Sequence, residues 1–330
     1  MPPVTAPSLT VLGLICTAAS MLAASAAVLA AEAYPNRPTR LILPAGVGGS
    51  TDAVGRIMAL QLSDRLGTQM IADNRAGAGG VIGVEMAAKA APDGHTLLLV
   101  SASQSTQPAL RKLPYDPVKS FTPIAKVASI YLTLVVHPSV PVNSVKDLIA
   151  LAKRKPGEVL FSGTGVGAHT TMVTELFKAT AGLDFVIIEF KSGGPAVIDL
   201  LGGHTHAMLA TISSVLPQIN AGKLKALGTT GAARSTLLPG VPTLGESGLP
   251  GFATVQWHGI VAPAGTPAPI VGRLDTEIKA ILTLDETRKR FLNAGAEPDY
   301  LGPAEFDAFS KRELDLWAGL IRKANIRMKE

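Results

Sequence analysis

Arg40-Leu41-Ile42-Leu43-Pro44, followed by Gly48-Gly49-Ser50-Thr51-Asp52 and then Ala53–Leu66, is the stretch that decides the fold. The first five residues are typical of a short buried strand, and the last segment repeats apolar residues at the spacing of one helix face. Gly67 follows, where a helix end favours glycine. A strand that leads through a glycine-rich loop into a helix is the unit of a parallel α/β sheet.

The same unit recurs along the chain. Further strands are predicted at Met70–Ala72, His95–Ser101, Leu132–His137, Val159–Ser162, Phe185–Phe190, Lys225–Gly228 and Thr254–Val261. Further helices are predicted at Val81–Ala90, Val145–Arg154, Thr170–Ala181, from the turn at Ser192–Gly194 through Leu201, Pro267–Leu284 and Ala304–Asn325. We therefore expect two α/β lobes, with the chain crossing near Ala128–Pro138 and returning near Phe252–Ala262. Residues 34–133 and 253–330 would form the first lobe, and residues 134–252 the second.

Composition supports an α/β protein. Of 330 residues, 47% are apolar but only 5% aromatic, and glycine (33) and proline (24) are plentiful, which fits many short loops better than a β-sandwich. Removing residues 1–33 would raise the formal charge from +5 to +6, because Glu32 is the only charged residue before Arg37. Basic residues are scattered without interleaved aromatics, so no nucleic-acid partner is expected.

The N-terminal segment indicates export. Leu9–Ala31 is almost wholly apolar and small, and Ala31-Glu32-Ala33 supplies an A-x-A cleavage pattern, so residues 1–33 are expected to be a signal peptide and the mature protein periplasmic. The first ten residues lack Lys and Arg, and an uncleaved membrane anchor stays an alternative. Cys16, the only cysteine, lies in this segment, so the mature chain would have no thiol.

Four glycine-rich loops carry the candidate ligand site. In open parallel sheets, ligands bind beyond the carboxyl ends of the strands, where helix N-termini offer free N–H groups and partial positive charge. Each loop alone is explained by a tight turn and a helix cap, but four at strand-to-helix junctions favour an anion site. The candidate ligand-binding residues are Gly48, Gly49, Ser50, Thr51, Asp52, Ala78, Gly79, Ser103, Ser162, Gly163, Thr164, Gly165, His169, Lys191 and Ser192.

Nucleotide and catalytic motifs are incomplete. Gly77–Gly83 comes close to a dinucleotide fingerprint, but its third glycine is one residue late and no acidic residue follows at the right distance. There is no phosphate loop and no G-x-S-x-G nucleophile elbow. His204 and His206 form an H-x-H pair that fits a loop better than a metal site, and Asp184 and Glu189 are expected to face solvent. We expect no enzyme activity, no metal and no cofactor.

An ordered set of motifs extends over the mature chain. It consists of Tyr34-Pro35-x-Arg37-Pro38, Asp73-Asn74-Arg75-Ala76-Gly77-Ala78-Gly79-Gly80-x-x-Gly83, Pro92-Asp93-Gly94-x-Thr96-Leu97-Leu98, Ser162-Gly163-Thr164-Gly165, Leu200-Leu201-Gly202-Gly203, Val241-Pro242-Thr243-x-x-Glu246 and Trp257-x-Gly259. With these motifs the chain resembles the Bug-type substrate-binding proteins of tripartite tricarboxylate transporters.

The resemblance implies a type II periplasmic-binding-protein fold, in which two α/β lobes close over a ligand cleft and the crossover strands act as the hinge. It also implies that the loops at Gly48–Asp52, Asn74–Gly80 and Ser162–Gly165 hold a di- or tricarboxylate, an acidic amino acid or an aromatic acid. The protein would be a monomer that delivers its ligand to membrane subunits of a transporter; the alternative is a sensing subunit for a membrane sensor kinase. Ala45, the segment Glu189–Gly194 and His206 depart from the family pattern.

Overall fold

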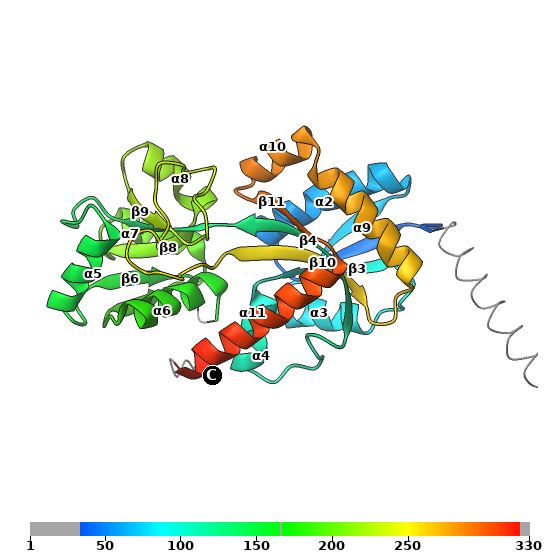
Figure 1. The fold of residues 1–330 in the computed structure, drawn as a ribbon, viewed down its shortest axis with the longest axis horizontal. Coiled ribbons are helices and arrows are strands. Elements are labelled where there is room, and N and C mark those ends of the chain that lie inside the picture. Colours follow the sequence, from blue (N-terminus) through cyan, green and yellow to red (C-terminus); the bar gives the residue numbers. More distant parts are fainter. Residues whose placement is uncertain (1–33, 166, 324–330) are drawn as a thin grey trace, which may run out of the picture.

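The computed structural model describes residues 34–165 and 167–323, which form two α/β lobes side by side (Figure 1). The expected signal peptide lies outside these residues. The first lobe contains a six-stranded sheet in the order β11-β4-β10-β3-β1-β2. Its strands are β1 (Thr39–Leu43), β2 (Met70–Asn74), β3 (Thr96–Ser101), β4 (Phe121–Ile130), β10 (Gln256–Pro263) and β11 (Glu297–Leu301). Its helices are α2 (Ser50–Leu66), the short 3₁₀ turn η1 (Ala78–Gly80), α3 (Val81–Ala88), α4 (Ser103–Leu110), α9 (Ala268–Leu282) and α10 (Asp285–Asn293).

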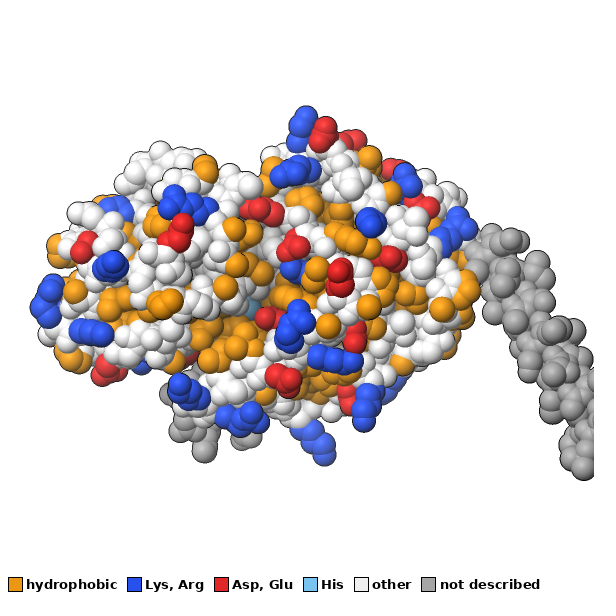
Figure 2. All heavy atoms as spheres, in the orientation of Figure 1, with side chains coloured by type: hydrophobic (Ala, Val, Ile, Leu, Met, Phe, Trp, Pro, Cys, Tyr) orange, Lys and Arg blue, Asp and Glu red, His pale blue; other side chains and the backbone are white. Residues whose placement is uncertain are grey.

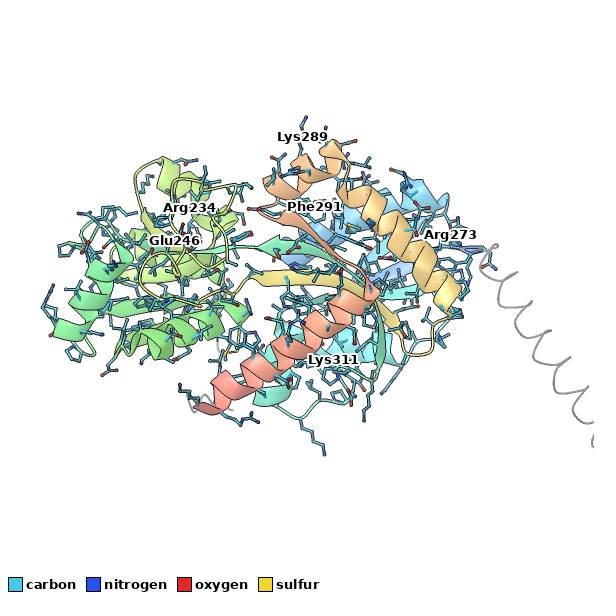
Figure 3. The ribbon with its side chains drawn as sticks, in the orientation of Figure 1. Arg234, Glu246, Arg273, Lys289, Phe291 and Lys311 are labelled. Carbon is cyan, nitrogen blue, oxygen red and sulfur yellow. The ribbon has the colours of Figure 1, made fainter. Side chains whose placement is uncertain are left out.

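The second lobe contains a five-stranded sheet in the order β7-β6-β8-β5-β9. Its strands are β5 (Leu132–Val136), β6 (Leu160–Gly163), β7 (Val186–Glu189), β8 (Ala207–Thr211) and β9 (Lys225–Thr229), and its helices are α5 (Val145–Arg154), α6 (His169–Ala181), α7 (Gly193–Leu201) and α8 (Ile212–Asn220). The segment after β9 is fixed by a capping box, in which Glu246 accepts from Thr243 N at 2.7 Å and pairs with Arg234 at 3.1 Å (Figure 3).

The chain crosses between the lobes twice. Only Tyr131 separates β4 from β5, so this crossover is a nearly continuous strand, and the chain returns to the first lobe through β10 (Figure 1). Because one strand leaves the first lobe and the other returns, β10 runs antiparallel to both β3 and β4, and β5 runs antiparallel to β8 and β9. The sheets are therefore mixed: β1 is parallel to β2 and β3, and β6 to β7 and β8, as the repeated strand-loop-helix unit predicts, while the crossover strands add antiparallel pairs.

Several elements escaped the sequence reading for local reasons. β4 contains Pro123 and Lys126, which obscure its apolar pattern; Lys126 is only 5% exposed and pairs with Asp299. β8 reads Ala-Met-Leu-Ala-Thr, with little β propensity, and α4 is polar and contains a proline. α8, α10 and β11 were likewise not predicted. Tertiary packing, not local preference, decides these elements.

The C-terminal helix α11 (Pro303–Lys323) spans both lobes (Figure 1). Near its start, Phe306 packs edge-on against Trp257 of β10, with ring centroids 5.7 Å apart. Towards its end, Trp317 and Ile321 are buried in the core of the second lobe. The sequence predicts residues 253–330 as part of the first lobe, but the second half of this helix also packs against the second lobe. None of the helices formed by residues 34–165 and 167–323 combines the length and hydropathy needed to cross a membrane.

Candidate functional site

A cleft of about 740 Å³ lies between the lobes, within the range of small-molecule sites. Its walls are Val47, Gly48, Gly49, Ser50, Ala53, Thr164, Thr170, Ser192, Gly193, Gly194, Met208, Ala210, Thr211, Ser213, Ser214 and Ala294. Among these described residues there is no Lys, Arg, His, Asp or Glu. Hydroxyl groups, backbone and small apolar side chains therefore make up the wall. Elsewhere, Figure 2 shows Lys and Arg side chains scattered over both lobes on the face in view.

Three helix N-termini open onto this cleft. α2 begins at Ser50 after Gly49, α7 at Gly193 after Ser192, and α8 at Ile212 after Thr211. None of the three N-cap residues makes a side-chain capping bond. The first N–H groups of a helix have no acceptor within the helix, and the helix dipole places partial positive charge there. Together these ends supply neutral donors for an anion from both lobes.

Ser50 is oriented by a residue of the crossover strand. The side-chain amide of Gln256 donates to Ser50 Oγ at 3.1 Å. Since the hydroxyl oxygen accepts this bond, its own proton is free to be donated to a ligand in the cleft. Gln256 was not predicted from the sequence, because it lies 206 residues from Ser50 and carries no motif.

Asp52 stabilises the first loop instead of lining the cleft. Its carboxylate, 4% exposed, accepts from Gly48 N at 2.9 Å and from Asn74 Nδ2 at 3.0 Å, and pairs with Arg56 at 2.9 Å. Burial opposes ionisation, but the hydrogen bonds from Gly48, Arg56 and Asn74 hold the pKa of Asp52 below its usual value. The charge of this carboxylate is therefore stabilised by groups of the protein, and its bonds to Gly48 and Asn74 connect the first loop with the second.

The second-lobe loop is partly satisfied from within. Thr164 lines the cleft, and its hydroxyl contacts the hydroxyl of Thr170. Its backbone N–H donates to Thr171 Oγ1 at 3.0 Å, and Gly165 N donates to Glu189 Oε2 at 2.8 Å. Glu189 is exposed, as expected from the sequence, but it also holds a loop of the candidate site. Asp184 is exposed.

The fourth loop is the most open. Ser192 lines the cleft at the start of α7 and is exposed. Lys191, next to it, is also exposed, and no hydrogen bond or ion pair joins it to another described residue. An exposed ammonium group next to a residue of the cleft wall is suited to attract an anion from solution.

Other candidates lie outside the cleft wall. Ala78 and Gly79 are in η1, where their carbonyl oxygens accept from Arg111 at 3.2 Å and from Gln107 at 3.5 Å. Ser103 begins α4, and its hydroxyl is 2.8 Å from that of Ser101. The structure thus does not bring this second loop to the cavity formed by the other three loops.

A buried polar layer accounts for the remaining candidates. Ser162 is 1% exposed, with its hydroxyl 2.6 Å from that of Thr205, and Gly163 is buried beside it. Thr51 Oγ1 is 3.0 Å from Nε2 of His258, which is fully buried. His169, the first residue of α6, is 6% exposed and packs edge-on against Trp317 at 5.3 Å. These side chains support the loops from behind.

The H-x-H pair does not form a metal centre in the structure. His206 Nδ1 accepts from the backbone N–H of Leu160 at 2.9 Å, while His204 is exposed. No group of three His, Cys, Asp or Glu side chains within the described part of the chain has the geometry to hold a metal ion.

The third helix N-terminus at the cleft is not among the predicted loops. Thr211, Ser213 and Ser214 lie there, and Ser214 Oγ donates to Thr211 O at 2.8 Å. The signal was available: a short apolar run ending in Thr211-Ile212-Ser213-Ser214 is a fifth strand-to-helix junction. It was not recognised because β8 itself was not recognised.

Comparison with known proteins places the chain in a family. Residues 54–326 match the model of the tripartite tricarboxylate transporter family receptor. Protein BugT of Bordetella pertussis is 38% identical over 307 residues, which are 92% of this chain and 94% of BugT. Rpa4515 of R. palustris, solved with adipate, superposes with a TM-score of 0.79 at 32% identity, covering 89% of this chain and 99% of that one. MatC of Rhodopseudomonas palustris, solved with bound malate, has a TM-score of 0.75 at 29% identity, covering 87% and 100%.

These matches extend over both lobes, the crossover strands and the cleft between them. They confirm the type II periplasmic-binding architecture and a solute-binding role expected from the sequence. This chain belongs to the tripartite tricarboxylate transporter receptor family, whose Bug-type members are substrate-binding proteins and not enzymes.

Proposed function

We propose that this protein captures a small carboxylate, from the class of di- or tricarboxylates, acidic amino acids and aromatic acids, by closing its lobes over the cleft. The observation that carries the proposal is a wall without charged side chains into which three uncapped helix N-termini open. Such a wall neutralises carboxylates through N–H and hydroxyl donors contributed by both lobes. The adipate and malate bound by two relatives belong to this chemical class.

The two carboxylates of a diacid can each be bound by a separate set of hydrogen-bond donors in this cleft. The α2 end with Ser50 belongs to the first lobe, and the α7 and α8 ends belong to the second. Met208, Ala210 and Ala294 supply apolar surface within the same cleft, which suits a methylene spacer. A ligand that contacts both lobes stabilises the closed conformation, because only in that conformation can it contact both lobes at once.

Export and delivery follow from the same proposal. A receptor that collects a carboxylate for transport must lie outside the cytoplasm. We therefore expect residues 1–33 to be removed during export and the liganded protein to bind the membrane subunits of the transporter there. We expect the protein to act as a monomer, since each cleft is built from one chain. Presentation to a sensor kinase would use the same closed form.

A thermal-shift screen tests the proposed ligand class. The purified protein is heated with adipate, malate, aspartate, an aromatic acid, a sugar and a nucleotide. A ligand present at a hundred times its Kd adds about 2.7 kcal/mol to the free energy of unfolding, which raises the melting temperature by several degrees. We expect a rise with at least one carboxylate and none with the sugar or nucleotide. A rise with only the sugar or the nucleotide would contradict the proposal.

A further inference from the structure

A carboxylate of the protein itself occupies an anion-binding donor of the second-lobe loop. Glu189 Oε2 accepts from Gly165 N at 2.8 Å and lies 3.5 Å from Thr171 Oγ1, in the first turn of α6. We propose that Glu189 is a specificity-determining residue: its negative charge, held at this loop beside the cleft, selects against ligands that place a second carboxylate there. This inference rests on the proposed carboxylate-binding function.

The backbone is shaped to hold this carboxylate. The pairing of β6 with β7 places Glu189 opposite Gly163. A Cβ atom at Gly163 would lie 2.6 Å from Glu189 Oε2, so only glycine leaves room for the side chain to fold over the end of β6. Thr171 connects the two halves of the arrangement, because its hydroxyl also accepts from Thr164 N at 3.0 Å. The carboxylate is thus seated between the loop and the helix start.

Hydrogen-bond donors, not a counter-charge, hold Glu189 in place. No Lys, Arg or His forms an ion pair with it within residues 34–165 and 167–323. Partial burial raises the pKa of Glu189, and the carboxylate of Glu175 on α6 raises it further, while the bonds from Gly165 and Thr171 act in the opposite direction. An unpaired carboxylate of this kind is displaced more easily than one in an ion pair.

The position next to the cleft gives this contact a consequence for ligands. Thr164, which precedes Gly165, lines the cleft wall. A diacid with one end at Ser50 and the other near Thr164 brings its second carboxylate towards the like charge of Glu189. A monoacid held at the first-lobe loop has no group there. Glu189 therefore acts on the ratio of the two affinities more than on either alone.

Titration calorimetry with adipate and hexanoate tests this inference. Glu189→Gln keeps the shape and an acceptor for Gly165 N but removes the charge. We expect its affinity for adipate to rise about three- to tenfold, the size of one partly screened like-charge contact, and its affinity for hexanoate to change by less than about twofold. Glu158→Gln, which removes an exposed second-lobe carboxylate paired with Lys155, should change neither affinity.

The outcomes separate the inference from the proposed function. If Glu189→Gln leaves adipate binding unchanged or weakens it, Glu189 is a structural support of the loop and the inference is wrong. Equal tightening for both acids would also overturn it, because the effect would then be one of net charge. Glu189→Ala, with circular dichroism as a check on folding, must change the affinity ratio in the same direction as Glu189→Gln. If the unaltered protein binds no carboxylate at all, the proposed function itself fails.

Discussion

At the scale of single residues, the site relies on oriented neutral groups. Ser50 is placed by Gln256 of the crossover strand, and the carboxylate of Asp52 is turned into the loop that it stabilises. Donors that are fixed before the ligand arrives lose little entropy when it binds. Behind them, His258 on β10 and His169 on α6 are buried and uncharged at neutral pH.

Ser50→Ala tests the role of the oriented hydroxyl. We expect the ligand carboxylate to bind more weakly by roughly 1–3 kcal/mol, because a donated hydrogen bond to a charged group is lost. Calorimetry measures the change. Ser63→Ala in the same helix removes a hydroxyl bonded to Ala59 O and Met70 N, away from the cleft, and should leave affinity unaltered. Equal affinities for Ser50→Ala and the unaltered protein would remove Ser50 from the site.

The buried histidines predict how stability depends on pH. Burial lowers the pKa of His169 to about 4, and burial with the nearby His169 lowers that of His258 to about 3. The unfolded chain binds these protons near pH 6.5, so the free energy of unfolding is highest above that pH and falls as the pH drops towards 3. Near pH 5, two such protons give a slope of about 3 kcal/mol per pH unit.

Urea unfolding between pH 7 and 5 measures this slope. His258→Gln should reduce the histidine contribution by about half, because one of the two linked protons is gone. His204→Gln, at an exposed position, should leave the slope as it is. A slope that His258→Gln does not change would mean that His258 is not buried in its neutral form.

At the scale of elements, helix ends decide where the lobes touch and what they offer a ligand. α10 ends with Gly295 at φ +72°, where Gly295 N donates to Leu292 O and Ala296 N to Phe291 O. Phe291 is fully buried and anchors this helix in the first lobe (Figure 3). The turn at Ala294 and Gly295 thereby meets the N-terminus of α8 at Ser213 in the second lobe.

Gly295→Ala tests whether this contact limits closure. A Cβ at Gly295 would lie 2.0 Å from Cβ of Ser213, so a side chain there holds the lobes apart. We expect ligand affinity to fall by roughly 1–3 kcal/mol, the usual cost of overpacking. Gly265→Ala, at φ +86° with open space around it, is the matched control for the backbone strain. Adding Ser213→Gly to Gly295→Ala should restore much of the ligand affinity. If it does not, the loss comes from backbone strain at φ +72° and not from the contact with Ser213, which would argue against a closure contact.

Sequence patterns predicted the elements that combine a clear period with glycine or proline boundaries. α2, α5 and α9 follow that rule, and the predicted loop residues Gly48–Ser50, Thr164 and Ser192 line the cleft. β4 was not predicted because it contains Lys126, whose charge is paired with Asp299 far along the chain. β8 was not predicted because its sequence, Ala-Met-Leu-Ala-Thr, has little β propensity. Gln256 was not assigned to the site because its role comes from a contact with Ser50, 206 residues away, and Ser213 was not assigned because β8, which precedes it, was not predicted.

At the scale of the whole molecule, two lobes are joined by the nearly continuous β4–β5 crossover, by the return segment that leads into β10, and by one long helix. α11 is buried against Trp257 through Phe306 and against the second core through Trp317, so movement between the lobes must rearrange part of this helix contact. The interface also contains Glu297 of the first lobe, which accepts from Ser235 Oγ at 2.8 Å and from Thr236 N at 3.1 Å in the second. Ligand contacts in the cleft add to these bonds when the lobes are together.

Equilibrium titration of the purified protein with adipate and malate, followed by recovery of the ligand, tests the central claim most directly. We expect one ligand bound per chain, a negative heat-capacity change as the lobes bury apolar surface, and release of the same acid unchanged on denaturation. Failure of every carboxylate to bind, or recovery of a chemically altered product, would contradict it.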